Sequence, residues 1–527
     1  MIVLSQERTK RLVAIHGWSG TVLGLLLYVV LLTGAVAVFA HEIGSWSRGG
    51  DATTYGLPST VHRHLEARAR LVDPDFHHEI SVGTTDAGAL RLSFQDHRMN
   101  PETGRLEDYA HVFHVDPDTG ATLAQQEGFL RSLRAAESDG ALERFLIDLH
   151  VRLHVPEPWG LFLTGILGLV MMVAAISGFL MHRHLFRDLY TAPRGRGLLS
   201  DKRDRHVLAA AWGLPFSVLL AFTGAFFSFA ISLGLPVVAL VAFGGDQEAV
   251  IETVIGSPEA HDPRPAPLAS LDYVLMDSAE RAGSPARSIL IEDYGTAGSM
   301  LTVFHGAADG ALTGTTHMFD GATRAFLGEK PTLGTAPSAG SAAVSLMAPL
   351  HFGNFAGLAS KTAWFALGLA MSYVTATGML LWVRRRQESR LWQRFARAID
   401  ITLWGLPVAL LGSAVAYFLA RPMGDPLWWT PAGFLLAAGG AVALGLRRGD
   451  PAEAYRRLLA ALCLGLPLLR HLTGGASWSE VLIAGQLEVL TVDLLLICCG
   501  ALLWTAGLGR AGLSRDVPRT SALEPAE

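Results

Sequence analysis

Long apolar runs, separated by polar segments, dominate the pattern of this chain. A helix needs about 20 residues to cross a hydrocarbon core of about 30 Å, and by that measure the sequence predicts eight membrane spans. They cover approximately residues 13–40, 159–182, 207–240, 361–383, 399–420, 427–446, 456–473 and 482–507. The first run is much longer than the roughly 7 to 15 apolar residues of a signal peptide, which indicates a retained span.

Basic residues beside the spans predict the orientation. Lys and Arg cluster in residues 8–11 before the first span, in residues 183–205 between the second and third, and in residues 384–386 after the fourth. Cytoplasmic loops carry such an excess of positive charge. We therefore expect a multi-pass protein of a bacterial inner membrane with both termini in the cytoplasm.

Two long polar segments, residues 42–148 and 243–345, are expected on the periplasmic side. Each has about the length of a small domain. The first contains the helix-like "STVHRHLEARARLV", followed by the strand-like "LRLSFQDHR" and "HVFHVDPDTGATL" with an internal turn. The second repeats this order with "PLASLDYVLMDSAERAG", "SILIEDYG" and "MLTVFHG". Both segments therefore read as small α+β modules.

The two halves of the first four spans resemble each other. His16 is followed 17 residues later by "TGAVAVFA", and His206 is followed 17 residues later by "TGAFFSFA". The second span ends in "AISGFLMHR" and the fourth in "TATGMLLWVR". The repeated unit is a span, an external module and a second span, and the last four spans do not share it.

Composition narrows the possible functions. Half of the 527 residues are hydrophobic and the formal net charge is −5, so the chain has no basic face for nucleic acid. The expected contact is membrane lipid. The three cysteines, Cys463, Cys498 and Cys499, lie in apolar runs and indicate neither a disulfide framework nor a metal-binding CxxC pair.

The histidines form two groups when they are sorted by membrane side. Those expected near the cytoplasmic face are His16, His182, His184 and His206, and those near the external face are His41, His150, His154 and His351. Ionisable groups beside a lipid core are costly and usually mark a functional path. Neutral imidazole binds iron, copper and zinc, but structural zinc usually recruits Cys or acidic ligands. The surrounding Gly, Leu, Val and Phe suit a flat apolar macrocycle with two axial imidazoles.

Glycines recur about once a helical turn in the first two spans. They leave room either for a porphyrin face or for close helix packing, and the spacing alone does not decide between the two; the residues are Gly17, Gly20, Gly24, Gly160, Gly165 and Gly168. Residues 16–40 span about 36 Å as a helix. Two histidine sites near opposite faces would then serve as relay stations for electrons crossing the membrane.

The chain resembles the PepSY-associated transmembrane proteins, iron-regulated inner-membrane proteins that include ferric-siderophore reductases. The matching words lie between about residues 10 and 390. They are "HGWSGTVLGLLLYVVLLTG" with "FAHEIGSW", "LHVRLHVPEPWG", "SGFLMHRHLFRDLYTAPRGRG", "DRHVLAAAWGLPFSVLLAFTGA" and "PLHFGNFAGLASKTAWFALGLAMSYVTATGMLLWVRRR".

This resemblance implies a fold class and a division of the chain. The expected fold is an α-helical integral membrane protein with a duplicated four-helix haem-binding core, two periplasmic α+β PepSY-like domains and about four additional C-terminal helices. The segments are 1–41 (helix 1), 42–148 (PepSY-like domain 1), 149–240 (helices 2 and 3), 241–348 (PepSY-like domain 2), 349–386 (helix 4), 387–510 (helices 5–8) and 511–527 (cytoplasmic tail).

The resemblance also implies two haem b groups that pass electrons to ferric iron outside the cytoplasm. The family's span-end histidines fall on His16, His150, His154, His182, His206 and His351, whereas His41 and His184 lie outside the pattern. In an up-down bundle, helices of one direction can be diagonal. We therefore expect His16 with His206 at one haem, His182 as their neighbour or substitute, and His351 with His150 or His154 at the other.

The sequence leaves the electron donor, the electron acceptor and two alternative functions open. The expected acceptor is a ferric siderophore or another ferric chelate, and the donor is a quinol, a reduced flavin or a separate reductase, because no GxGxxG follows a strand. Glu488 and Asp493 in the last span mark either a quinol or proton site or a structural polar pair. The alternative functions are a non-enzymatic PepSY-domain protein that regulates a peptidase or binds a ligand, and a metal-ion transporter that uses the histidines.

Overall fold

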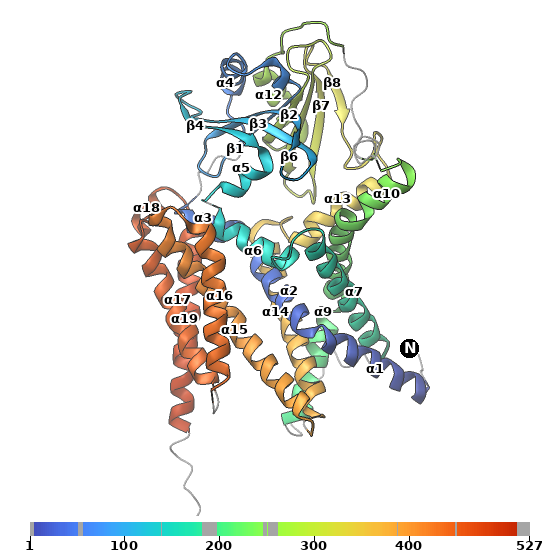
Figure 1. The fold of residues 1–527 in the computed structure, drawn as a ribbon, viewed down its shortest axis with the longest axis vertical. Helices are drawn as coiled ribbons and strands as arrows, with labels where there is room; N and C mark the ends of the chain where they lie inside the picture. The colour runs from blue at the N-terminus through green and yellow to red at the C-terminus, as the bar shows by residue number, and fades with distance from the viewer. Residues whose placement is uncertain are drawn as a thin grey trace, which may run out of the picture. The chain divides into compact units, whose positions relative to one another are not determined.

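The computed structural model describes residues 5–50, 56–138, 140–181, 198–245, 250, 262–386, 388–447 and 451–513. The described chain divides into two compact units. The first comprises Met1–His41, Asp51–Glu137 and Leu146–Trp382, and the second comprises Glu42–Gly50, Ser138–Phe145 and Val383–Glu527. Figure 1 shows their helices and strands.

The long helices of the first unit are built from apolar runs, because a helix satisfies every backbone donor and acceptor within one segment. They are α1 (Gln6–Val22), α2 (Gly24–Ala37), α7 (Trp159–Met181), α9 (Leu198–Phe229) and α14 (Gly357–Arg384). The shorter helices are α6 (Ala141–Arg152), α10 (Leu235–Ala242) and α13 (Ala339–Phe352), and a π-helical turn, Ala230–Gly234, joins α9 to α10.

An apolar core holds four of these helices together. Leu27 of α2, Leu167 of α7, Phe216 of α9 and Met371 of α14 are buried in one cluster. The Phe216 ring also packs edge-on against Trp364 of α14, with ring centres 5.2 Å apart. The four helices thereby fix one another along their length.

The number of spans differs from the prediction. Among the described residues, six helices are long and apolar enough to cross a membrane, or seven if α1 and α2 count as one span. The predicted first span bends by 67° between α1 and α2. The bend lies next to Gly24, and glycine weakens a helix because its backbone is conformationally free. The predicted span 456–473 does form a helix, α17 (Ala452–Leu472). Its arginines make it too polar to count among the helices that are apolar enough to cross a membrane.

The two polar segments form one antiparallel sheet of eight strands, in the order β4-β3-β2-β1-β5-β6-β7-β8. The first segment contributes β1 (Glu79–Thr84), β2 (Leu90–Asn100), β3 (Arg105–Val115) and β4 (Thr122–Phe129). The second contributes β5 (Ala286–Glu292), β6 (Met300–Ala307), β7 (Gly314–Asp320) and β8 (Phe326–Glu329). The two halves join where β1 pairs with β5.

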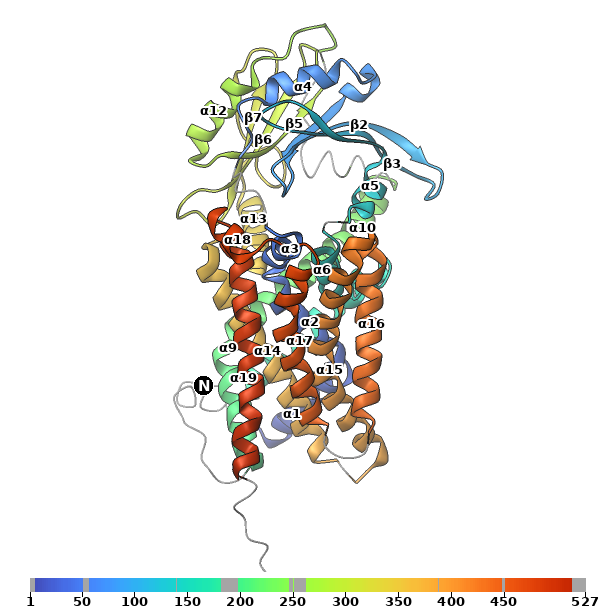
Figure 2. The same ribbon diagram turned by 90° about the vertical axis from the view of Figure 1, so that its left-hand side faces the viewer.

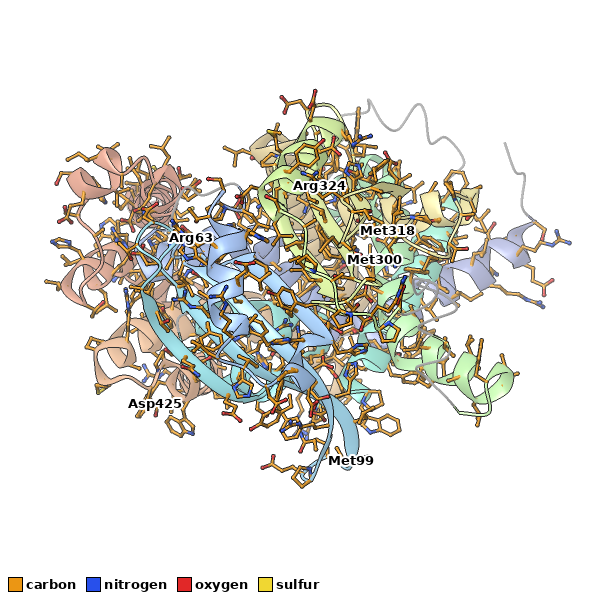
Figure 3. The ribbon with its side chains drawn as sticks, turned by 90° about the horizontal axis from the view of Figure 1, so that it is seen from above. Arg63, Met99, Met300, Met318, Arg324 and Asp425 are labelled. Carbon is orange, nitrogen blue, oxygen red and sulfur yellow. The ribbon has the colours of Figure 1, made fainter. Side chains whose placement is uncertain are left out.

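One face of this sheet is covered by two helices, α4 (Val61–Ala69) and α12 (Leu271–Ala282), which lie together over the strands in Figures 1 and 2. Alternate strand residues such as Ile80 and Ile291 enter a common core with Leu65 of α4 and Val274 of α12. In Figure 3 the sheet is seen from above, with Arg63 marking α4 and Met318 marking β7. Two segments predicted as separate modules therefore share one hydrophobic core.

The second unit consists of α3 (Ala40–Arg48), α15 (Arg390–Ala420), α16 (Pro426–Gly445), α17, α18 (Trp478–Ile483) and α19 (Leu487–Leu513). Helices α15 and α16 pack closely because small residues face each other: a Cβ added to Gly412 would lie 2.3 Å from Ala437 Cβ. Tyr455 of α17 and Val408 of α15 lie in the same buried cluster.

Candidate functional site

The first of two histidine pairs lies in the first unit. His16 of α1 faces His206 of α9, with ring centres 6.5 Å apart and ring planes at 73°. Both rings are partly buried. We call these residues the inner pair, after the membrane side expected from the sequence.

The second pair, which we call the outer pair, consists of His150 of α6 and His351 of α13. Their ring centres are 6.3 Å apart and their planes differ by 27°. His351 also contacts Phe227 and Phe352, whose rings lie 5.6 Å from it. Two apolar rings therefore lie against His351 of the outer pair.

The distance within each pair fits a shared metal ion. Imidazole nitrogens bind transition metals at about 2.0 Å, and each ring centre lies about 1.2 Å behind its nitrogen because the ring bonds are near 1.35 Å. Two imidazoles on opposite sides of one metal thus have centres about 6.4 Å apart. The observed 6.5 and 6.3 Å agree with this value.

Hydrogen bonds fix the tautomer of one ring in each pair through a backbone carbonyl. His16 Nδ1 lies 2.9 Å from the Ala174 oxygen in α7, and His150 Nδ1 lies 2.9 Å from the Val30 oxygen in α2. A carbonyl only accepts, so both Nδ1 atoms carry the proton. The Nε2 atom of each ring is then the one with a lone pair for a metal.

The other ring of each pair bonds a threonine hydroxyl. His206 Nδ1 lies 3.0 Å from Thr377 Oγ1 in α14, and His351 Nδ1 lies 2.8 Å from Thr223 Oγ1 in α9. Each hydroxyl donates its own hydrogen to a carbonyl one turn earlier, at 2.7 Å for Thr377 and 2.8 Å for Thr223. Each therefore accepts from the imidazole Nδ1–H, which again leaves Nε2 for a metal.

A glycine lies beside every one of the four imidazoles. A Cβ added to Gly34 would lie 2.6 Å from His150 Cε1, and one added to Gly178, Gly224 or Gly378 would lie 3.2 or 3.3 Å from the Cε1 atom of the facing histidine. Gly34, Gly178 and Gly378 also stand four residues after the carbonyls that the rings approach, which are those of Val30, Ala174 and Val374. Without a side chain there, the carbonyl stays open to the ring.

The duplicated words of the sequence contain a signal for this arrangement. A Ser or Thr followed by Gly occurs at residues 33–34, 177–178, 223–224 and 377–378, and so in each of the four core helices α2, α7, α9 and α14. In the sequence alone these words indicate a duplication but do not predict which residues face the histidines. Their recurrence opposite each histidine is what the structure adds.

The remaining predicted histidines lie elsewhere. His182 and His184 fall outside the described residues. His154 is exposed at the end of α6 with a φ of 54°, whereas His150, one turn earlier, faces His351. His41 is exposed at the start of α3. Of the two outer candidates, His150 is therefore the one that the fold places in a pair.

The donor set favours haem over a bare metal ion. Among the residues that the structure describes, no group of three or more His, Cys, Asp or Glu side chains could hold a metal. Zinc needs three or four protein ligands. A porphyrin supplies four nitrogens itself and needs two axial ligands, so a pair of imidazoles between apolar helices fits haem.

The acidic residues of the last span have different environments. Glu488 is exposed. Asp493 is fully buried and pairs with Arg470 at 2.7 Å, and its two oxygens also accept from the indoles of Trp46 at 2.7 Å and Trp478 at 3.0 Å. The Asp493 carboxylate therefore joins α3, α17, α18 and α19, and both of its oxygens have hydrogen-bond partners, which indicates a structural role.

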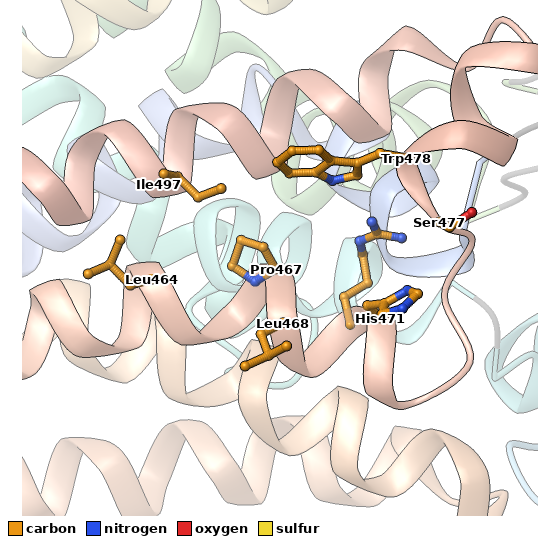
Figure 4. Close-up of a pocket in the computed structure, with 8 residues that line it drawn as sticks. Leu464, Pro467, Leu468, His471, Ser477, Trp478 and Ile497 are labelled. Atoms are coloured by element: carbon orange, nitrogen blue, oxygen red, sulfur yellow. The ribbon is translucent and has the colours of Figure 1, made fainter.

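A pocket of about 370 Å³ beside Asp493 is lined by Pro467, His471 and Trp478, among others (Figure 4).

Two comparisons relate this chain to known proteins. A sequence profile described as the PepSY-associated TM region matches residues 13–385. An uncharacterized protein of Pseudomonas aeruginosa is 31% identical to this chain over 377 residues, which make up 68% of this chain and 92% of that protein. The matched residues 13–385 include both histidine pairs and all eight strands.

Proposed function

The chain belongs to the family defined by the PepSY-associated transmembrane region, and from that premise we propose that it is a di-haem b-type oxidoreductase of the bacterial inner membrane. It passes electrons across the membrane to ferric iron, in a ferric siderophore or a similar chelate, on the periplasmic side. The observation that carries this proposal is that the two rings of each histidine pair are separated by the distance that two imidazoles sharing one metal ion would have.

The spacing of the pairs suits a relay. His206 of the inner pair and Thr223, which bonds His351 of the outer pair, both lie on α9. The separation of 17 positions corresponds to about 25 Å of helix, close to the thickness of a hydrocarbon core. Haem supplies a reversible one-electron centre when bound, and the protein sets its position and potential.

The residues of this chain have defined tasks in that role. Four histidines would hold the metal through Nε2, and the carbonyls and hydroxyls on Nδ1 hold each ring in place; they are His16, His206, His150 and His351. The apolar cluster between α2, α7, α9 and α14 excludes water from the region between the pairs. The electron donor is a quinol, a reduced flavin or a separate reductase.

Reduction releases iron from its chelate. Anionic oxygen ligands hold the smaller charge of Fe²⁺ more weakly than that of Fe³⁺. The chain therefore needs no covalent chemistry of its own. Delivery of one electron to the ferric chelate suffices.

Histidine substitutions test the proposal through haem content. The protein is purified in detergent, and its haem b is counted by the pyridine haemochrome assay alongside oxidised and dithionite-reduced spectra. We expect about two haems per wild-type chain, because the chain has two facing histidine pairs and each would hold one haem. His206→Ala and His351→Ala should each lose one, and His154→Ala should keep both because that side chain is exposed.

Two results would contradict the proposal. A colourless wild-type protein, expressed with ample haem, would favour the binding-protein alternative, or the transporter if it held metal ions. Retention of both haems by His206→Ala and by His351→Ala would remove the assignment of the pairs.

A further inference from the structure

We propose that Thr223 and Thr377 are positioning residues that set the reduction potentials of the outer and the inner haem, one each, through the Nδ1–H group of the facing histidine. This inference rests on the proposed function. Neither residue would touch a haem, since each acts through an imidazole.

The two hydroxyls are built into the helices as acceptors. Thr223 is fully buried and Thr377 is 9% exposed, so water does not readily take their place. Each hydroxyl donates its hydrogen to a carbonyl of the same helix. Thr223 donates to the Leu219 carbonyl, and Thr377 donates to the Tyr373 carbonyl. The oxygen is thereby turned into an acceptor aimed at the histidine.

An acceptor on Nδ1–H makes the imidazole a stronger donor at Nε2. A more basic axial ligand stabilises ferric over ferrous iron and lowers the reduction potential. In each pair, the partner ring bonds a backbone carbonyl that no side-chain substitution removes. The threonine is therefore the nearest side-chain acceptor in each pair, because the Ser177 hydroxyl lies farther away, 3.4 Å from His16 Nδ1.

The two threonines differ in one respect. The carbonyl of Val374 also faces His206 and can accept from it when the Thr377 hydroxyl is removed. For His351 the acceptor that the structure shows is the Thr223 hydroxyl. Loss of the hydroxyl should therefore affect the outer haem more than the inner one.

The angles between the rings allow the two haems to be told apart. The ring planes cross at 73° in the inner pair and at 27° in the outer pair. When haem is bound, crossed imidazole planes would act equally on two perpendicular iron d orbitals and give a strongly anisotropic ferric EPR signal. Nearly parallel planes would split these orbitals and give a rhombic signal. Each haem then has its own spectroscopic label.

The test uses the full-length holoprotein in detergent with Thr223→Val and Thr377→Val, which keep the shape of the side chain. Potentials are measured by redox titration of the visible bands, and EPR identifies the haem that changes. Thr223→Val should raise the potential of the outer haem alone and weaken its retention about 10- to 100-fold. Thr377→Val should shift the inner haem alone, by less.

Two controls separate positioning from packing. Thr223→Ser and Thr377→Ser keep the hydroxyl and should restore the wild-type potentials. Thr21→Val alters a buried threonine that donates to the Gly17 carbonyl in its own helix and should shift neither potential.

The inference fails if both haems are present and neither valine variant shifts a potential, or if one variant shifts both haems equally. It also fails if the serine variants behave like the valine variants. A wild-type protein without haem would instead refute the proposed function, so the two failures are distinguishable.

Discussion

Glycine residues beside the four histidines leave the space that the imidazole rings occupy. Gly34 is the tightest case, since a Cβ there would lie 2.6 Å from His150 Cε1 and 3.0 Å from His150 Nδ1. Gly20, on the preceding helix, has no atom within 4 Å of such a Cβ. Two glycines in similar sequence contexts therefore differ in whether a side chain would fit: Gly34 has no room for one, whereas Gly20 does.

Gly34→Ala should displace the His150 ring and lose the outer haem, because forcing a methyl group into a packed site costs about 1–3 kcal/mol. Gly20→Ala is the matched control and should keep both haems. The haem-to-protein ratio after purification measures the difference. Equal haem content in the two variants would mean that the ring can move without losing its ligand role.

At the scale of the elements, the helices of the second unit are joined by a buried polar cluster rather than by apolar packing alone. Arg470 and Asp493 have side chains only 1% and 0% exposed, and the indole of Trp46 brings α3 into the same cluster. A buried ion pair is not strongly stabilising overall, but losing one partner leaves an uncompensated charge. The cluster therefore fixes how these helices meet.

Asp493→Ala should destabilise the second unit by about 3–5 kcal/mol because Arg470 would remain buried without its carboxylate. The free energy of unfolding is measured by denaturant titration in detergent. Arg470→Met with Asp493→Leu should recover most of the loss, and Glu453→Gln, at an exposed ion pair, should cost at most about 1 kcal/mol. Unchanged stability of Asp493→Ala would show that the pair is dispensable. Unchanged haem reduction by quinol would agree with a structural role.

At the scale of the whole molecule, the two duplicated segments meet in one sheet through the pairing of β1 with β5. Ile80 and Val82 stand opposite Ile291 and Ile289 on the covered face. On the other face, Glu79 stands directly opposite Glu292. Burial is the main cause that raises the pKa of Glu79, and the negative charge of Asp108 raises it further. Burial likewise raises the pKa of Glu292, and the negative charge of Glu79 adds to the effect.

The junction between β1 and β5 should therefore weaken as the pH rises. The folded pKa of each carboxyl lies above the unfolded value of 4.5, so the stability it contributes is complete below that value and is lost as the pH rises through the folded pKa. Glu79→Gln should stabilise the junction at pH 8 by up to about 1 kcal/mol, and much less in acid. Hydrogen exchange of β1 and β5 peptides in the full-length protein measures this, with Glu102→Gln as control. Faster exchange in Glu79→Gln at pH 8 would contradict the argument.

The sequence by itself determined the features that depend on local pattern. Apolar runs predicted most of the long helices, alternation predicted strands in both polar segments, and the duplication related His16 to His206. The membrane family followed from the same words. These features are encoded in neighbouring residues, because helix and strand periods show within a few turns.

Only the tertiary structure decided how distant segments meet. It chose His150 over His154 as the partner of His351, bent the first span at Leu23, and joined β1 to β5 across about 200 residues of chain. It also placed a Ser/Thr–Gly word against each paired histidine. Ring separations, acceptor contacts and strand order between segments depend on packing between residues far apart in the chain, which no local period records.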